Sequence, residues 1–372
     1  MADKTHNPNG LNRREALAAT AGIAALAGLP SRSARAHERS SVPVIDVHTH
    51  MYTDGWLDRI RENPDDSIRL VQGERSEEID YRGARIARIS PEMLDWEQRI
   101  ANMDEAGVDV AIISLTAPNV YVASKQLSIT LARQVNDDFA EQQARFPSRI
   151  RWLASLPWEH PAEALEELAR VRTTGASGLC MLTNILGAPL TDPKFAPIWA
   201  AIEDSGLPVF IHPTTPFMDG MGLGEFGLAN TIGFTVETSL CFARMFLDGM
   251  LDRHPGLKLI ACHGGGALPY LIARFDRMFE RGITPPKAAN PPSFYLSKVW
   301  YDAIVYDRQT LQFLIDQVGE DRVLYGSDYP FLIGDMKGVL ERVDALDPQV
   351  RDKVRGLNAQ ALFDLTDRAS HR

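Results

Sequence analysis

The sequence of 372 residues contains 39 Lys+Arg against 49 Asp+Glu, which gives a formal net charge of −10. Nucleic-acid binding is not expected of such an acidic chain, because proteins that bind phosphate backbones normally present a basic patch. No apolar run reaches the length of a membrane span, and the three cysteines, without a CxxC pair, exclude a disulfide scaffold and a thiolate zinc site. The composition therefore favours an ordinary globular protein with a sizeable core.

Residues 1–36 are expected to be an export signal of the twin-arginine (Tat) type. Arg13 and Arg14 precede a weakly apolar Ala/Gly/Leu-rich run that ends at Leu29, and an Ala-Arg-Ala cleavage site follows that run. The twin-arginine route exports proteins that are already folded, so we expect a periplasmic location. The alternative is an unstructured tail on a cytoplasmic protein. Residues 37–372 are then expected to form a single domain.

From residue 42 onward, short runs rich in Val, Ile and Leu alternate with helical patterns, which is typical of a parallel α/β fold. Most of the runs are continuously apolar, as expected for strands that are buried on both faces. The predicted strands are residues 42–48, 108–115, 150–156, 177–182, 208–212, 257–263, 299–305 and 322–328. Helices are predicted between them, for example at residues 92–106, 125–146, 161–173, 193–205, 267–281 and 308–318. This alternation predicts a decorated (β/α)8 TIM barrel; a doubly wound open sheet is the alternative, although no GxGxxG follows any strand.

One long segment interrupts the alternation of strands and helices. Residues 52–90 are polar, carry charges of both signs and separate the first strand from its helix. An insertion at this place lies on the C-terminal face of a barrel, where active sites are found. We therefore expect residues 52–90 to be a lid over the substrate.

Histidines and one aspartate fall at the C-terminal ends of predicted strands. His48 and His50 are two residues apart at the end of the first strand, so their side chains point to the same face. His212, His263 and Asp328 end three further predicted strands. Each histidine alone would more often be structural, but the C-terminal ends of barrel strands meet at one mouth. Together these residues predict a site for a divalent catalytic metal.

Four motifs surround these residues: VIDVHTH at 44–50, IHP at 211–213, CHGGG at 262–266 and YGSDYP at 325–330. They resemble the amidohydrolase superfamily, and most closely its aminocarboxymuconate semialdehyde decarboxylase branch. The resemblance extends from about residue 42 to about residue 365, including Asp302 in the segment YDA. It implies that one zinc ion is bound and that His263 is the catalytic histidine; the implied ligands are His48, His50, His212 and Asp328.

A single metal is expected rather than two. Many members of the superfamily bind a second metal through a carboxylated lysine at the end of the fourth strand, but residues 178–184 read GLCMLTN, without lysine. Three imidazoles and one carboxylate leave a position for water, whose pKa a zinc ion lowers toward about 7. His263 is expected to orient or deprotonate that water, and the second oxygen of Asp328 can also transfer a proton.

Arginines are the expected partners of a substrate carboxylate, because a guanidinium group binds a carboxylate through two parallel hydrogen bonds. By resemblance, Arg85 and Arg88 fall about where the decarboxylases place arginines that bind substrate. Arg274 matches the position from which the family inserts an arginine into the neighbouring subunit's site, which implies a homodimer. Each of these arginines could instead be a solvated surface charge.

The main hypothesis is a zinc-dependent, non-oxidative decarboxylase that acts on an aromatic or unsaturated carboxylic acid. The first alternative is a hydrolase of a lactone or an amide, because the same metal and the same proton-transfer groups serve both reactions. A more remote alternative is a metal-stabilised binding protein without turnover. The sequence does not identify the substrate.

Overall fold

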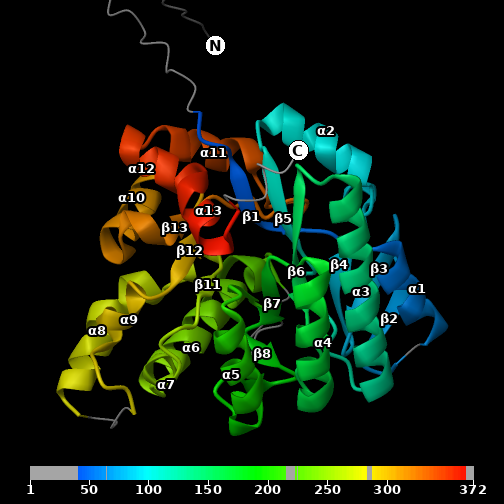
Figure 1. The fold of residues 1–372 in the computed structure, drawn as a ribbon, viewed down its shortest axis with the longest axis horizontal. Helices are drawn as coiled ribbons and strands as arrows, with labels where there is room; N and C mark the ends of the chain where they lie inside the picture. Colours follow the sequence, from blue (N-terminus) through cyan, green and yellow to red (C-terminus); the bar gives the residue numbers. More distant parts are fainter. Residues whose placement is uncertain (1–40, 64, 215–222, 224, 283–286, 366–372) are drawn as a thin grey trace, which may run out of the picture. The chain divides into compact units, whose positions relative to one another are not determined.

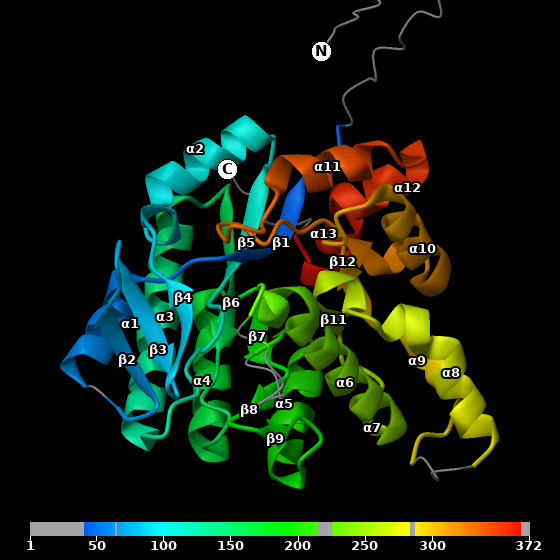
Figure 2. The ribbon, with the colours of Figure 1, turned by 180° about the vertical axis from the view of Figure 1, so that it is seen from behind.

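The computed structural model describes residues 41–365 apart from residues 64, 215–222, 224 and 283–286. The export signal expected at residues 1–36 lies outside the described residues. Parallel strands form the centre of the described part, and helices surround them (Figures 1 and 2). No helix in residues 41–365 combines the length and the apolarity that crossing a bilayer requires.

Eight parallel strands pair in the order of the chain, except for the small insertions between them. The last strand returns to the first, because Val47 N donates to Tyr325 O at 3.1 Å and His50 N donates to Tyr329 O at 2.8 Å. The predicted (β/α)8 barrel is thereby confirmed, and the open sheet is wrong. The barrel strands are β1 (Ile45–His50), β5 (Val110–Ser114), β6 (Ile150–Ser155), β7 (Gly178–Leu182), β10 (Val209–His212), β11 (Leu259–Ala261), β12 (Trp300–Asp302) and β13 (Val323–Leu324).

The helices around the barrel begin and end close to their predicted positions. Asp95 and Ser124 cap two of them by accepting hydrogen bonds from backbone N–H groups, and Gly107 ends one at a φ of 78°. The longer helices are α2 (Trp96–Ala106), α3 (Lys125–Arg145), α4 (Pro161–Thr174), α5 (Ala196–Ser205), α6 (Phe234–Leu247), α8 (Leu268–Glu280), α10 (Arg308–Val318) and α11 (Met336–Asp344). The shorter ones are α7 (Met250–Arg253), α9 (Pro292–Leu296), α12 (Pro348–Asp352) and α13 (Asn358–Phe363).

The barrel interior is filled by apolar side chains and closed at one end by the last helix, α13. Phe210, Ile260 and Leu324 from three strands form a buried cluster with Leu362 and Phe363 of α13. Side chains near the N-terminal ends of the strands are therefore used for packing. Polar side chains that serve chemistry have room only at the opposite, C-terminal mouth.

The insertion after the first strand folds as a unit of its own. It consists of α1 (Asp54–Glu62) and a three-stranded antiparallel sheet, β2 (Ile68–Gln72), β3 (Glu77–Tyr81) and β4 (Ala84–Arg88). Figure 2 shows it beside α3. Tyr81 Oη donates to Tyr121 O at 2.8 Å, which joins the sheet to the loop after β5. The insertion is thus anchored at the C-terminal side of the barrel, and its role as a lid stays a prediction.

Two of the expected strand-end residues lie in turns beyond the strands. β11 ends at Ala261 and β13 at Leu324, so His263 and Asp328 both lie beyond the last residues of these strands. Both have positive φ, 53° and 58°, a conformation that strand pairing does not allow. The prediction that they end strands 6 and 8 is therefore wrong in detail, although both still lie at the mouth.

Candidate metal centre

Four buried side chains from three places in the chain meet at the mouth of the barrel. β1 supplies His48 and His50, β10 supplies His212, and the turn after β13 supplies Asp328. Their ligand atoms all lie within 4.8 Å of one another. The ring centroids of His50 and His212 are 4.9 Å apart, and so are those of His48 and His50. The structure thus brings together the four residues that the sequence assigns to a metal.

The donor atoms of these residues fit a divalent cation. Nε2 of His48 and Nε2 of His50 are buried and have no hydrogen-bond partner among the described residues. They lie 3.4 Å and 3.5 Å from Oδ1 of Asp328. Two ligands about 2.1 Å from a shared ion at a tetrahedral angle would be about 3.4 Å apart. The separation therefore matches ligands around one ion better than direct hydrogen bonds.

The other ring nitrogen of each histidine is already engaged, which fixes the orientation of each ring. Nδ1 of His48 lies 2.6 Å from Asp302 Oδ2, and Nδ1 of His50 lies 3.0 Å from Ser114 Oγ. Nδ1 of His212 lies 2.7 Å from the carbonyl oxygen of Pro213. Such contacts are typical of metal-binding histidines, because they leave Nε2 for the ion.

Asp302, at the end of β12, was not predicted as a site residue, although its segment YDA was noted in the sequence. Besides the contact with His48, it accepts hydrogen bonds from the backbone N–H groups of His263 (2.8 Å) and Gly264 (3.0 Å). One carboxylate therefore orients a metal-binding ring and fixes the turn that carries His263. Its position at a strand end of the barrel is the signal by which the sequence could have identified it.

The charges of the cluster favour a cation at its centre. Burial alone would lower the pKa of His48, but the carboxylates of Asp302 and Asp328 outweigh burial and raise it to about 10. Burial opposes ionisation of Asp328, yet His263, His48 and His50 hold its pKa well below the usual range. Burial lowers the pKa of His50 to about 4, so that ring is a neutral donor. Buried carboxylates and a neutral imidazole suit a positive ion.

His263 lies beside the four ligands but outside their set. Its Nε2 is 3.6 Å from Asp328 Oδ2, and 13% of its side chain is exposed at the mouth. The turn requires glycine three residues after His263, since a Cβ on Gly266 would lie 2.1 Å from the carbonyl oxygen of Thr235. His263 can therefore exchange a proton with Asp328 while it faces the space that a substrate would enter.

Asp46 supports the site without binding in it. It is fully buried and accepts hydrogen bonds from Ser327 Oγ at 2.5 Å and from Ser327 N at 3.1 Å. Burial raises its pKa to about 7. The contact links β1 to the turn just before Asp328, so Asp46 holds together the two segments that carry metal ligands.

The predicted substrate arginines lie in exposed positions. Arg85 and Arg88, on β4, have side chains that are 56% and 53% exposed. Both pair with Glu78: Arg85 Nη1 lies 2.7 Å from Oε2 of Glu78, and Arg88 Nε lies 3.8 Å from Oε1. Arg274 lies exposed on α8. Within the described residues, no recorded contact joins these three arginines to the histidine cluster. Their roles stay predictions.

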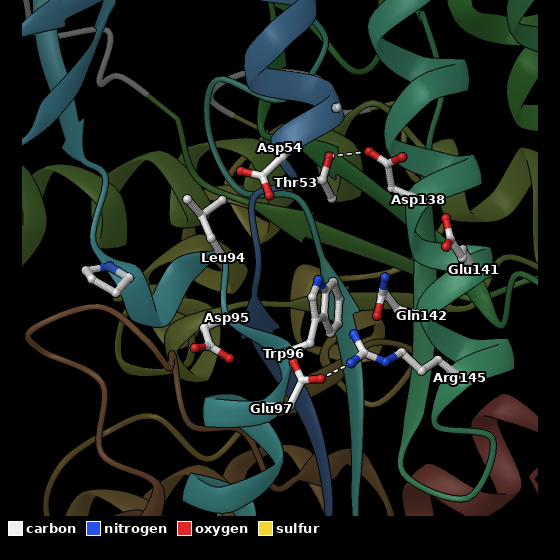
Figure 3. A pocket seen from close by; sticks show the side chains of 12 residues that line it. Thr53, Asp54, Leu94, Asp95, Trp96, Glu97, Asp138, Glu141, Gln142 and Arg145 are labelled. Atoms are coloured by element: carbon white, nitrogen blue, oxygen red, sulfur yellow. Dashed lines mark hydrogen bonds and ion pairs between the residues drawn. The ribbon is translucent and has the colours of Figure 1, made fainter.

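A separate cavity of about 610 Å³ lies between α1, α2 and α3, and no histidine lines it (Figure 3). Three of the carboxylates that line it have local partners. Asp138 accepts a hydrogen bond from Thr53 at 2.5 Å, Asp95 caps α2, and Glu97 pairs with Arg145. Helix capping and ion pairing account for these groups, so the cavity adds nothing to the chemistry of the metal centre.

A closed parallel barrel with a buried cluster of three histidines and one aspartate at its C-terminal mouth is an arrangement suited to a metal-dependent barrel enzyme. The family described as amidohydrolase matches residues 45–365, and the chain belongs to this family.

Similar proteins include two curated decarboxylases and a solved structure. The chain is 29% identical to 2-amino-3-carboxymuconate-6-semialdehyde decarboxylase of Dictyostelium discoideum, over 85% of this chain and 90% of that protein. It is 30% identical to gamma-resorcylate decarboxylase of Rhodococcus jostii, over 82% of this chain and 96% of that protein. The chain is also similar to a solved structure of 5-carboxyvanillate decarboxylase from Novosphingobium aromaticivorans, which contains bound manganese and a nitrobenzoic acid. The TM-score is 0.76 and the sequence identity is 27%, and the match covers 87% of this chain and 97% of that one.

Proposed function

We propose that the protein is a metal-dependent, non-oxidative decarboxylase of an aromatic or unsaturated carboxylic acid. The observation that carries the proposal is the buried set His48, His50, His212 and Asp328, with His263 facing Asp328 at 3.6 Å. The similar proteins support the reaction type, because both curated relatives and the solved structure are named decarboxylases. Two of those names specify aromatic acids, and the third specifies an unsaturated one.

The site has the groups that this reaction needs. In a decarboxylation without oxidation, the carbon that bears the carboxylate gains one proton, its bond to the carboxylate carbon breaks, and CO₂ leaves. One proton must therefore be delivered per turnover. Asp328 Oδ2 and His263 Nε2 form the pair that can hold and deliver it, since both lie at the mouth of the barrel. The Asp302 carboxylate keeps His263 in place by accepting a hydrogen bond from the backbone N–H group of His263.

A single divalent cation is proposed for the four ligands. When bound, such an ion supplies Lewis acidity toward an oxygen atom of the substrate or of water. A nitrogen-rich ligand set fits zinc, whereas the similar structure holds manganese. Metal analysis of the purified protein distinguishes the two, and about one equivalent per chain is expected. Two equivalents would contradict the single-metal proposal.

The deciding experiment compares CO₂ release with ring opening. Purified protein reconstituted with zinc or with manganese is incubated separately with a panel of hydroxybenzoic acids and with a panel of lactones and amides. Release of CO₂ from at least one acid, abolished in His263→Ala, is expected. Turnover of lactones or amides alone would overturn the decarboxylase proposal in favour of a hydrolase. Metal binding without any turnover would favour a binding protein.

We propose a homodimer in which Arg274 reaches the neighbouring site. The support is the exposed face of α8, where Tyr270, Arg274 and Met278 are spaced four residues apart; Tyr270 is 79% and Met278 41% exposed. Arg274→Ala and His263→Ala are each expected to be inactive. Co-expressed, they should regain about a quarter of the activity, because half of the dimers would be mixed and would contain one complete site. No recovery would contradict the shared site.

We also propose that residues 1–36 direct the folded protein to the periplasm. The support is the sequence alone: Arg13 and Arg14 before a weakly apolar run. Replacement of both arginines by lysine should retain the protein in the cytoplasm, as measured by fractionation of the producing bacterium. An unchanged distribution would contradict the proposal.

A further inference from the structure

Arg99 is a fully buried cation on α2, and it contacts the segment that carries two of the metal-binding histidines. None of its surface is exposed. One guanidinium nitrogen donates to Thr49 Oγ1 at 2.6 Å, another donates to the carbonyl oxygen of His50, and Nε lies 3.1 Å from Met51 Sδ. Three consecutive residues of one chain segment are thus held by one side chain.

The same guanidinium group also contacts the segment that carries Asp328. Its central carbon lies 4.5 Å from the centroid of the Tyr329 ring, and Tyr329 follows Asp328 directly. The Tyr329 hydroxyl accepts a hydrogen bond from Asn102, also on α2, at 2.6 Å. The carbonyl oxygen of Tyr329 accepts hydrogen bonds from His50 N at 2.8 Å and from Thr49 Oγ1 at 3.1 Å. Arg99 therefore lies where the first and last strands of the barrel meet.

The contacts of Arg99 explain why a charged side chain lies buried at this place. Within the described residues, no carboxylate forms an ion pair with Arg99, and the cost of removing its charge from water is offset by neutral hydrogen-bond acceptors, by an aromatic face and by the longer-range charge of Asp46. An apolar residue of similar size would leave Thr49 Oγ1 and the carbonyl oxygen of His50 without these donors. The side chain is explained by what it joins: the segment with His48 and His50 and the segment with Asp328.

We propose that Arg99 is a positioning residue that fixes the junction of the first and last strands and so sets the distance between His50 and Asp328 for metal binding. The inference rests on the metal site of the proposed function. It concerns the affinity and geometry of the bound ion, which can be measured without any substrate. Arg99 donates no hydrogen bond to the ion's ligand atoms, and none of its surface is exposed at the mouth.

The test compares Arg99→Met, which keeps the length of the side chain but removes its donors, with Arg149→Met. Arg149 is a matched control because it also donates to backbone carbonyl oxygens, those of Asp109 (2.8 Å) and Val108 (3.0 Å). These two residues come just before the first residue of β5, at the end of the strand away from the mouth. Dissociation constants for Mn²⁺ and Zn²⁺ are measured by chelator competition, and the visible spectrum of the Co²⁺ form reports ligand geometry. Thermal unfolding of the metal-free proteins measures stability separately.

Arg99→Met is expected to bind Mn²⁺ at least about 10-fold more weakly and to change the Co²⁺ spectrum, as losses of supporting contacts around metal ligands do. Arg149→Met should bind both metals like the wild type. A folded Arg99→Met protein with wild-type affinity and spectrum would overturn the proposal. If it does not fold, Tyr329→Leu, which removes the ring beneath the guanidinium group and the hydroxyl that accepts from Asn102, takes the same test with the same criteria. Failure of the wild type to bind metal would instead overturn the proposed metal centre.

Discussion

The mouth of the barrel and the insertion after β1 both carry charged residues, but they hold them in different ways. At the mouth, Asp302 is fully buried and contacts His48 at 2.6 Å, 254 positions away in the sequence. In the insertion, Arg85 is 56% exposed and pairs with Glu78, seven positions away. Buried contacts between distant segments fix geometry, whereas exposed pairs between neighbours contribute little and rearrange easily. The comparison suggests a rigid metal centre beside an adaptable surface.

The largest effect is expected from His263→Ala. Loss of a group that transfers a proton costs about 10²- to 10⁴-fold in kcat, whereas the four ligands are untouched. The variant should therefore bind about one metal ion per chain and show almost no CO₂ release, as measured by metal analysis and a CO₂ assay. Loss of metal together with activity would show that His263 belongs to the ligand set.

Asp302→Asn tests the rigidity of the mouth. The amide keeps the size of the carboxylate but removes the negative charge that faces His48. Changes of this type cost about 10- to 100-fold in metal affinity. Titration with a chelator measures the effect, and Asp307→Asn, at the exposed cap of α10, is a control that should leave metal affinity unchanged. An unchanged affinity in Asp302→Asn would remove the contrast between the two regions.

Arg88→Ala and Arg85→Ala test the adaptable region. If an arginine of β4 turns from Glu78 to a substrate carboxylate, KM should rise about 10-fold with a smaller change in kcat, because about 1.4 kcal/mol corresponds to a factor of 10 in binding. Glu78→Gln should then lower KM slightly, since it releases both arginines. Steady-state kinetics of the three variants measure KM and kcat and so show whether either arginine binds the substrate. Unchanged KM in both arginine variants would identify them as surface charges.

The smallest effect is expected at Asp138, in the cavity beside the insertion. Burial raises the pKa of Asp138 above its usual 3.8, so the folded protein holds this proton more tightly than the unfolded chain does. The stability from this group is present at low pH and is lost as pH rises through the folded pKa. Asp138→Asn should therefore gain stability relative to the wild type as the pH rises above about 4, as measured by thermal unfolding over a series of pH values. A constant difference would contradict the raised pKa.

The sequence predicted the barrel and the ligand set because both depend on patterns that are local. Continuous apolar runs marked the strands, and the residue types His and Asp at their ends marked the mouth. Asp302 and Arg99 were missed because their importance comes from partners far along the chain: His48 for Asp302, and Thr49 and Tyr329 for Arg99. A buried arginine in a helix looks like any surface charge until the packing is known. The antiparallel sheet of the insertion was missed because its strands are only five residues long and their apolar residues are interrupted by charged ones.

The junction between β1 and the turn after β13 has a consequence for synthesis. Thr49 and Tyr329 are 280 positions apart, and metal ligands lie next to both of them. A ribosome that has made the first strand still has nearly the whole barrel to translate before Asp328 emerges. The complete ligand set therefore cannot assemble during most of translation, and nascent or truncated chains lack the full ligand set. Tight metal uptake would report that the chain has been finished.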